Sequence, residues 1–281
     1  MMEKLLIVDG MNLLFQMFYG MPAQILNRQG RAIQGTIGFV GALLRMIRME
    51  RPGYVLVVFD GESHNPRKDL DENYKANRPD YSDMDENEIP FSQLPDIYAA
   101  LDYLGICHKD TSDCEADDWI AGYVRQYKDR FTITVASQDS DFFQLIDDRV
   151  HILRYRGDNT VICDRNWLMN KYGIHPEQYA AFKSMTGDSA DNIRGVDKVG
   201  PKTAAWLLQS YGSIEGIVDH AQEITKPAIR KSVQESTDRL QKNMELICLN
   251  GCCFLPFPPE QLRWQYRGQT SSQVLNAIRL Y

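Results

Sequence analysis

The stretch KLLIVDG, residues 4–10, decides the fold that the sequence predicts. It is a short apolar run of strand length that ends at Asp9. Two further runs, YVLVVF at 54–59 and TITVA at 132–136, have the same character and also end at or near an aspartate. Segments with helical spacing lie between these runs, so strands alternate with helices. This alternation predicts an α/β fold with a parallel, doubly wound sheet.

Length and composition narrow the class of protein. The chain has 281 residues, of which 43% are hydrophobic, so it can bury a full core. The N-terminal apolar run is too short for a signal peptide, and no later run could cross a bilayer. We therefore expect a cytoplasmic monomer with no membrane partner. The six cysteines form no C-x-x-C pair and predict neither a disulfide framework nor structural zinc.

Acidic residues follow the predicted strands and also cluster at short spacings elsewhere. Asp139 and Asp141 would project to the same side of an extended chain. Asp188 and Asp191 would share one face of a predicted helix. Seven of the carboxylates could come together at the edge of the sheet where ligands of such folds bind. The full set is Asp9, Asp60, Glu115, Asp117, Asp118, Asp139, Asp141, Asp188 and Asp191.

The cluster TSDCEADDW at 111–119 also has an ordinary structural interpretation. Ser112 and Glu115 can form a capping box, and the two aspartates that follow favour the positive end of a helix dipole. As a set, however, nine carboxylates would repel one another unless cations neutralised them. Oxygen ligands without histidine or cysteine favour Mg²⁺ or Mn²⁺. Two such ions can clamp the attacking and leaving oxygens of a phosphoryl displacement.

The net charge of −7 argues at first against nucleic acid as a partner, because phosphate binding usually leaves a basic footprint. If nine acidic residues are neutralised by metal, 29 of the 38 remain, against 31 basic residues. A nucleic-acid partner is therefore compatible with the composition.

Six motifs occur in a fixed order: LLIVDG, VVFDG, RKDLDENYKANRP, DCEADDWIA, ASQDSDFFQL and GDSADNIRGVDKVGPKTA. Together they resemble the bacterial and phage 5′-nucleases, or flap endonucleases, which include the 5′-nuclease domain at the front of bacterial DNA polymerase I. The resemblance implies a PIN-like parallel-sheet domain with a helical arch, followed by a helical domain containing a helix-hairpin-helix. It also implies a two-metal phosphodiesterase that acts on DNA with a 5′ flap, overhang or nick.

The domain boundaries follow from where the strand signals fade, after about Asn170. We place the nuclease domain at 1–170, with its arch at about 61–93, and the helical domain at 171–281. The apolar stretch LNGCCFLPFPPEQL, residues 249–262, is expected to pack back onto the sheet domain. No polymerase sequence follows Tyr281, so we expect a stand-alone protein. Helical spacing is found at 38–49, 94–104, 176–185, 201–211 and 229–249.

The resemblance also assigns roles to individual residues by position. The first metal site corresponds to Asp9, Asp60, Glu115 and Asp117, with Asp118 beside it. The second corresponds to Asp139, Asp141 and Asp188, with Asp191 as an outer ligand. Lys75 and Arg78, in NYKANRP, would share a helix face in the arch and stabilise negative charge on the scissile phosphate.

Residues 195–203, GVDKVGPKT, nearly match the phosphate loop of an ATPase, but Pro201 breaks its spacing and no strand precedes it. The segment instead looks like a helix-hairpin-helix in which Gly195 and Gly200 permit a tight turn. Pro201 suits the first turn of the second helix, whose main-chain N–H groups would face a DNA phosphate. The residues expected to bind DNA are Lys198, Val199, Gly200, Pro201, Lys202 and Thr203. The resemblance further implies a K⁺ ion held by the carbonyl oxygens of Met185, Thr186, Arg194, Val196 and Val199.

The sequence thus predicts a structure-specific 5′-nuclease, a flap endonuclease or 5′–3′ exonuclease, that serves DNA replication or repair. Hydrolysis would proceed in line without a covalent intermediate and leave a 5′-phosphate and a 3′-hydroxyl. Two other functions remain open. One is a PIN-like metal-dependent ribonuclease, and the other is a non-catalytic protein that binds DNA structures.

Overall fold

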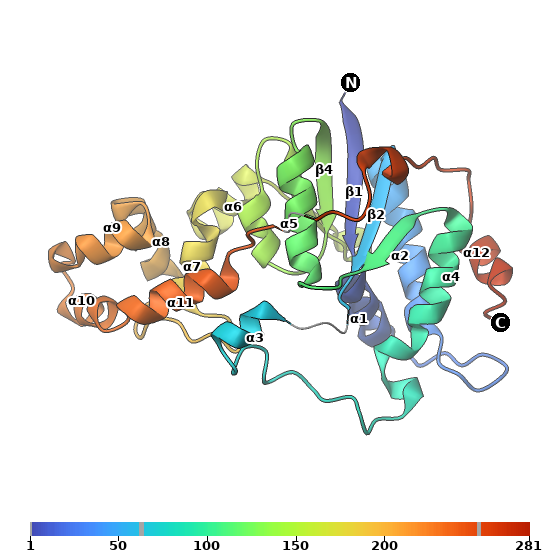
Figure 1. The fold of residues 1–281 in the computed structure, drawn as a ribbon, viewed down its shortest axis with the longest axis horizontal. Coiled ribbons are helices and arrows are strands. Elements are labelled where there is room, and N and C mark those ends of the chain that lie inside the picture. Colours follow the sequence, from blue (N-terminus) through green and yellow to red (C-terminus); the bar gives the residue numbers. More distant parts are fainter. Residues whose placement is uncertain (1, 62–64, 252–253) are drawn as a thin grey trace.

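The computed structural model describes residues 2–61, 65–251 and 254–281, and a six-stranded sheet lies at its centre (Figure 1). The strand order is β3-β2-β1-β4-β5-β6. The first five strands are parallel and β6 pairs antiparallel to β5, so the predicted parallel sheet is confirmed except at this edge. The strands are β1 Glu3–Asp9, β2 Tyr54–Phe59, β3 Cys107–Asp110, β4 Phe131–Ala136, β5 Val150–Arg154 and β6 Val161–Cys163.

Helices cover both faces of the sheet because β1 is apolar on both sides. Leu5 and Ile7 pack with α5, Ala116–Tyr127. Leu6 and Val8 point to the opposite face. Figure 1 shows α5 on one side of the sheet and α2, α4 and α12 on the other. The helices around the sheet also include α1 Gly10–Gly20, α2 Gln34–Glu50, α4 Leu94–Leu104 and α12 Ser271–Ala277.

The position of β1 fixes where a ligand site can form. Its neighbours are β2 on one side and β4 on the other, with Asp9 opposite Val58 and Val8 opposite Ala136. The chain therefore leaves this strand in two directions, and a crevice opens beyond the carboxyl ends at such a switch point. The acids that follow the central strands lie at this edge.

The second part of the chain is helical, and no strand occurs after Cys163 in the part of the chain that the structure describes. The helix predicted at 201–211 is confirmed as α8. The one predicted at 229–249 is divided in two, because α10 ends before Ser236, from which α11 starts. The helices here are α6 Arg165–Tyr172, α7 Tyr179–Thr186, α8 Pro201–Tyr211, α9 Ile214–Asp219, α10 Pro227–Gln234 and α11 Thr237–Ile247.

The segment expected to be a helical arch is mostly not helical. Its first helix, α3 Pro66–Leu70, begins at the Asn65 cap and lasts five residues. Residues 71–85 then form turns, and short 3-10 turns follow at Glu86–Glu88 and Pro90–Gln93. Figure 1 shows the segment running from beside α11, below the sheet, to α4. Residues 62–64 of the predicted arch lie outside the described residues.

The C-terminal segment returns to the sheet, as the apolar stretch at 249–262 predicts. The Tyr123 hydroxyl is hydrogen-bonded to the main chain of Phe257, and the Trp264 N–H donates to the Gly53 carbonyl at 2.8 Å. Helix α12 then packs against α2 and α4. The boundary placed at residue 170 stays a prediction.

The cysteines agree with the expectation of reduced thiols over the described chain. The free ones are Cys107, Cys114, Cys163 and Cys248, whereas Cys252 and Cys253 lie outside the described residues. Among the described helices, none combines the length and the apolar character that a membrane span requires.

Candidate active site at the carboxyl edge of the sheet

Three aspartates at the ends of neighbouring strands are held by hydrogen bonds from the surrounding main chain and side chains. Asp9 caps α1 by accepting the Asn12 N–H at 3.0 Å, and its second oxygen accepts the Ser137 hydroxyl at 2.8 Å. Asp60 accepts the Ala116 N–H at 2.7 Å, which joins the end of β2 to the start of α5. Asp139 accepts the N–H of Asp141 at 2.9 Å.

These carboxylates repel one another, which shows in their proton affinities. Burial, followed by the charges of Asp60 and Asp139, raises the pKa of Asp9 to about 7. The pKa of Asp117 lies well above its usual value, through burial and then Asp139, Asp9 and Asp60. Burial likewise raises the pKa of Asp60. These four acids are therefore close enough to share a cation, which is the partner that such a set requires.

Glu115 differs because basic residues surround it. Burial alone would raise its pKa, but Lys75 and Arg67 hold that pKa below its usual value. Its carboxylate accepts from Arg67 Nη1 at 2.6 Å, from the Asn65 amide at 3.0 Å and from the Lys75 ammonium. Glu115 stands at the N-cap of α5 without a side-chain cap. The capping box with Ser112 is therefore absent, and that hydroxyl donates to Asp113 instead.

Asp118 is turned toward Arg67 of α3. The guanidinium binds both of its oxygens, Nη1 to Oδ2 at 2.8 Å and Nη2 to Oδ1 at 2.9 Å. The Arg67 Nε donates to the Leu246 carbonyl at 2.9 Å, so one buried arginine joins α3, α5 and α11. Sequence reasoning missed Arg67, although it lies inside the motif RKDLDENYKANRP.

Asp141, Asp188 and Asp191 form a second group, with one oxygen from each within 4.8 Å of the others, which is a geometry that could hold a metal ion. Their local structure differs from the prediction, because Asp188 and Asp191 do not share a helix face. They lie in a tight turn closed by Asp188 and Ile193, whose main chains exchange hydrogen bonds of 2.8 and 2.7 Å. The turn, rather than a helix, brings the two carboxylates together.

Lys183 of α7 lies between two members of this group and donates to both Asp141 and Asp188. It is 6% exposed, so its charge is compensated by these neighbours. The pKa of Asp188 is lowered because Lys183 outweighs the effect of burial. The pKa of Asp141 is raised to about 7, since burial and Asp139 outweigh the same lysine. Lys183 stands five residues before Asp188, and that spacing did not mark it as part of the site.

Lys75 and Arg78 reach the same edge from turns, not from the shared helix face that was predicted. Lys75 has a left-handed backbone, φ 57°, which strains a residue with a side chain. Its N–H donates to the Asp191 carbonyl at 3.1 Å, and the Arg78 guanidinium binds the Asp191 carboxylate at 3.1 Å. The turn is thereby fixed to the second acidic group.

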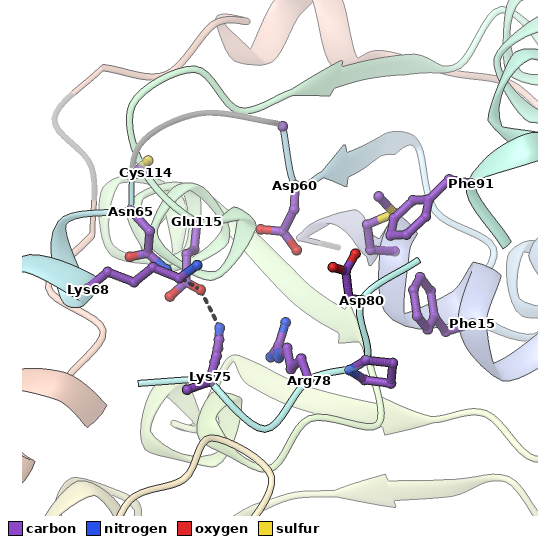
Figure 2. A pocket seen from close by; sticks show the side chains of 14 residues that line it. Phe15, Asp60, Asn65, Lys68, Lys75, Arg78, Asp80, Phe91, Cys114 and Glu115 are labelled. Carbon is purple, nitrogen blue, oxygen red and sulfur yellow. Dashed lines mark hydrogen bonds and ion pairs between the residues drawn. The ribbon is translucent and has the colours of Figure 1, made fainter. Parts of the chain in front are cut away.

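A cavity of about 510 Å³ opens over the edge, and Figure 2 shows the side chains around it. Asp60 and Glu115 reach it from the sheet domain, and Lys75 and Arg78 lie below them in this view. An adjoining cavity, also about 510 Å³, shares Asp60, Lys75 and Arg78 and is further lined by Asp9, Asp117 and Asp139. Both volumes are ample for a nucleotide.

Aromatic side chains close the other side of the cavity, and sequence reasoning missed them as well. Phe15 and Phe91 lie opposite Glu115 in Figure 2, with ring centroids 5.4 Å apart. Tyr81 packs edge-to-face against both rings. Aromatic faces of this kind can stack on nucleobases.

The link between α7 and α8 contains the predicted hairpin. A Cβ on Gly195 would lie 2.4 Å from the Met185 carbonyl oxygen, so this position requires glycine. Gly200 has φ −91° and open space around it, so the tight turn predicted there does not depend on it. Pro201 begins α8, as predicted. The surface here is formed by Lys198, Gly200, Pro201 and Lys202, which are exposed, by the half-buried Thr203 and by the buried Val199.

The carbonyls predicted to hold K⁺ come from both sides of this hairpin. The Met185 oxygen accepts the Val196 N–H at 2.8 Å, and the Val196 oxygen accepts the Val199 N–H at 3.1 Å. The Arg194 oxygen accepts the Asn243 amide at 2.9 Å. A carbonyl oxygen has two lone pairs, so these bonds leave room for a cation, and the donor set fits K⁺. Thr186 completes the predicted set at the end of α7.

Comparison with protein families separates the chain into two consecutive matches. Residues 4–173 match the model of the 5′-3′ exonuclease, N-terminal resolvase-like domain. Residues 174–270 match the model of the 5′-3′ exonuclease, C-terminal SAM fold.

Individual relatives agree with these matches. The thermostable DNA polymerase I of Thermus aquaticus is 32% identical over 245 residues, which are 86% of this chain and 28% of the polymerase. The chain thus spans little more than a quarter of that relative. A 5′-3′ exonuclease of Aquifex aeolicus is 30% identical over 244 residues, covering 86% of this chain and 82% of that protein.

A structure of the bacteriophage T5 flap endonuclease in complex with DNA and metal ions has the same fold, with a TM-score of 0.73. It is 21% identical and covers 88% of this chain and 89% of its own. The two family matches, read with the acidic edge described above, lead to one conclusion. The chain belongs to the 5′-3′ exonuclease family.

Proposed function

We propose that this protein hydrolyses phosphodiesters of DNA as a structure-specific 5′-nuclease, with two divalent cations at the carboxyl edge of the sheet. The observation that carries the proposal is the convergence of acids from distant parts of the chain. Asp141, Asp188 and Asp191 approach within 4.8 Å, and Asp9, Asp60, Asp117 and Asp139 are coupled through their charges. Family membership supports the same activity.

The donor atoms of the site fit hard cations, because they are carboxylate oxygens without histidine or cysteine. Bound Mg²⁺ or Mn²⁺ would activate water and neutralise charge that develops on the phosphate. We assign Asp9, Asp60, Glu115 and Asp117 to the first ion. Asp139, Asp141 and Asp188 would hold the second, with Asp191 as an outer ligand. Asp118 keeps its place beside the first ion, where its two bonds to Arg67 suit it to orient that arginine.

Lys75 and Arg78 would bind the scissile phosphate. In this structure their charges face Glu115 and Asp191. When metal and substrate neutralise those carboxylates, the two cations can exchange carboxylate oxygens for phosphate oxygens. Such fixed charges at the reacting phosphate lower the barrier without reorganisation.

The duplex part of the substrate would lie along the hairpin. Main-chain N–H groups at the start of α8, with Lys198 and Lys202 beside them, suit phosphate oxygens. The K⁺ ion would hold the carbonyls of the same hairpin. Contacts of this kind read the backbone and not the bases, so the substrate is defined by shape, as a 5′ flap, overhang or nick. The complex of DNA with the T5 flap endonuclease supports this choice.

The deciding experiment compares wild type with Asp139→Asn on a 5′-flap duplex and a matching RNA, with Mg²⁺. Asp129→Asn is the control, because Asp129 has a side chain 94% exposed. We expect the wild type and the control to release a 5′-phosphorylated DNA product. Loss of one carboxylate should cost several kcal/mol in the transition state, which is at least about a hundredfold in rate. Cleavage of RNA alone would favour a ribonuclease, and binding without cleavage in the wild type would favour a structural binder.

A further inference from the structure

Lys68 projects from α3 into the cavity over the acidic edge. The same cavity is lined by Asp60, Glu115, Lys75 and Arg78. Figure 2 shows Lys68 beside Glu115 on one side, with the aromatic rings of Phe15 and Phe91 on the other. Its amine therefore faces the space that the proposed function reserves for the DNA strand.

The charge of Lys68 is available, unlike that of the other two cations of the cavity. Lys75 faces Glu115, and Arg78 faces Asp191. Lys68 is exposed, and its side chain makes no ion pair or hydrogen bond to any residue that the structure describes. An anion that enters the cavity meets this ammonium without having to displace a carboxylate among those residues.

The short helix that carries Lys68 is fixed in place relative to the acidic edge. Asn65 caps it through the Arg67 N–H at 2.9 Å and donates to Glu115 at 3.0 Å. Arg67, the residue just before Lys68, binds Glu115 and Asp118. The stem of Lys68 thus starts from a defined position beside Glu115, which reduces the entropy lost when its amine binds.

We propose that Lys68 binds a second phosphate of the DNA strand, next to the one that is cleaved. This inference rests on the proposed function, because Asp60 and Glu115 would fix the scissile phosphate and thereby place its neighbours. A lysine suits that role as a mobile point charge with three donors, for which the direction of the phosphate oxygens is not critical. The contact would select an anionic strand and leave the base sequence unread.

The first test measures the affinity for a 5′-flap duplex, with Ca²⁺ replacing Mg²⁺, over a range of salt concentrations. We compare Lys68→Ala and Lys68→Arg with wild type, and use Lys226→Ala, an exposed lysine of the helical region, as the control. Losing one phosphate contact should reduce the slope of log affinity against log salt by about 0.7–0.9. Lys68→Arg should restore the slope, and Lys226→Ala should not change it. An unchanged slope in Lys68→Ala would overturn the inference.

The second test locates the contact. Single neutral methylphosphonate linkages are placed in turn at the phosphates that flank the cleavage point. The loss of affinity caused by Lys68→Ala should disappear at one of these positions, because the contact is already missing there. If the loss persists at every position, Lys68 does not bind a neighbouring phosphate. Failure of the wild type to cleave any flap would instead reject the proposed function, so the two failures can be told apart.

Discussion

Arg67 binds the carboxylate of Asp118 through two parallel hydrogen bonds, of 2.8 and 2.9 Å, from neighbouring turns of chain 51 residues apart. The same guanidinium reaches Glu115 and the Leu246 carbonyl. Arginine alone offers this planar set of donors, and each acceptor would otherwise keep a poorly compensated charge or dipole. The acidic edge of the sheet is therefore built around a cation as well as around carboxylates.

Replacing Arg67 should accordingly destabilise the protein. Arg67→Met leaves Asp118 and part of Glu115 without a partner, and removing one member of a buried ion pair costs about 3–5 kcal/mol. Arg67→Lys keeps the charge but not the paired geometry, so we expect an intermediate loss. Urea unfolding measures both variants. Arg149→Met, at a half-exposed pair with Asp129, should stay close to wild type, and equal effects of Arg149→Met and Arg67→Met would contradict this explanation.

Lys183 neutralises two carboxylates that the proposal gives to a metal. Lys183→Met should lower the free energy of unfolding of the metal-free protein, because Asp141 and Asp188 then face each other without a cation. Mg²⁺ should restore more stability to this variant than to wild type. Thermal unfolding with and without Mg²⁺ tests both statements, with Lys231→Met at a side chain 75% exposed as the control. A variant that is destabilised but indifferent to Mg²⁺ would argue against a metal site at these acids.

The hairpin offers a matched pair of glycines. Gly195→Ala places a Cβ 2.4 Å from the Met185 oxygen and 2.5 Å from the Thr186 carbonyl carbon, so the backbone must move. Overpacking of this kind costs about 1–3 kcal/mol. Gly200→Ala meets nothing within 4 Å at an ordinary φ of −91°, and its stability should match wild type. Calorimetry on the two variants decides the point, and a loss confined to Gly200→Ala would contradict it.

The acidic edge should also make the stability of the metal-free protein depend on pH. The pKa values of Asp9 and Asp141 rise from 3.8 to about 7 on folding, so the native state holds protons that the unfolded chain releases. Their contribution to stability is therefore present below pH 4 and is lost as the pH rises to about 7. Glu115 and Asp188 have lowered pKa values and act oppositely, but only below their ordinary values of 4.5 and 3.8.

Urea unfolding in a chelating buffer should accordingly show lower stability at pH 8 than at pH 5. Asp9→Asn should weaken this dependence, because its side chain cannot titrate. Mg²⁺ should stabilise the protein more at pH 8 than at pH 5, since at the lower pH it must displace protons. A stability that rises between pH 5 and pH 8 without metal would be the opposite of the expected sign.

The sequence by itself determined the features that depend on neighbouring residues. An apolar run followed by aspartate predicted β1, β2 and β4, and strand ends in a parallel sheet meet at one edge, so the edge position of Asp9 and Asp60 followed as well. The helix at 94–104 and the start of α8 at Pro201 agree with the structure for the same reason. The edge strands β3 and β6 were missed, because they are short and partly exposed and lack an apolar run.

Only the tertiary structure decided which charges compensate one another. The contacts of Arg67 with Leu246 and of Lys183 with Asp141 join residues 179 and 42 positions apart, and no local pattern specifies such pairs. The same holds for the turn that brings Asp188 to Asp191, and for Lys75, whose strained backbone is held by Asp191. Local sequence sets the direction in which a chain leaves an element, whereas the packing of distant elements sets which side chains share a buried volume. In that volume a charge is stable only beside its opposite.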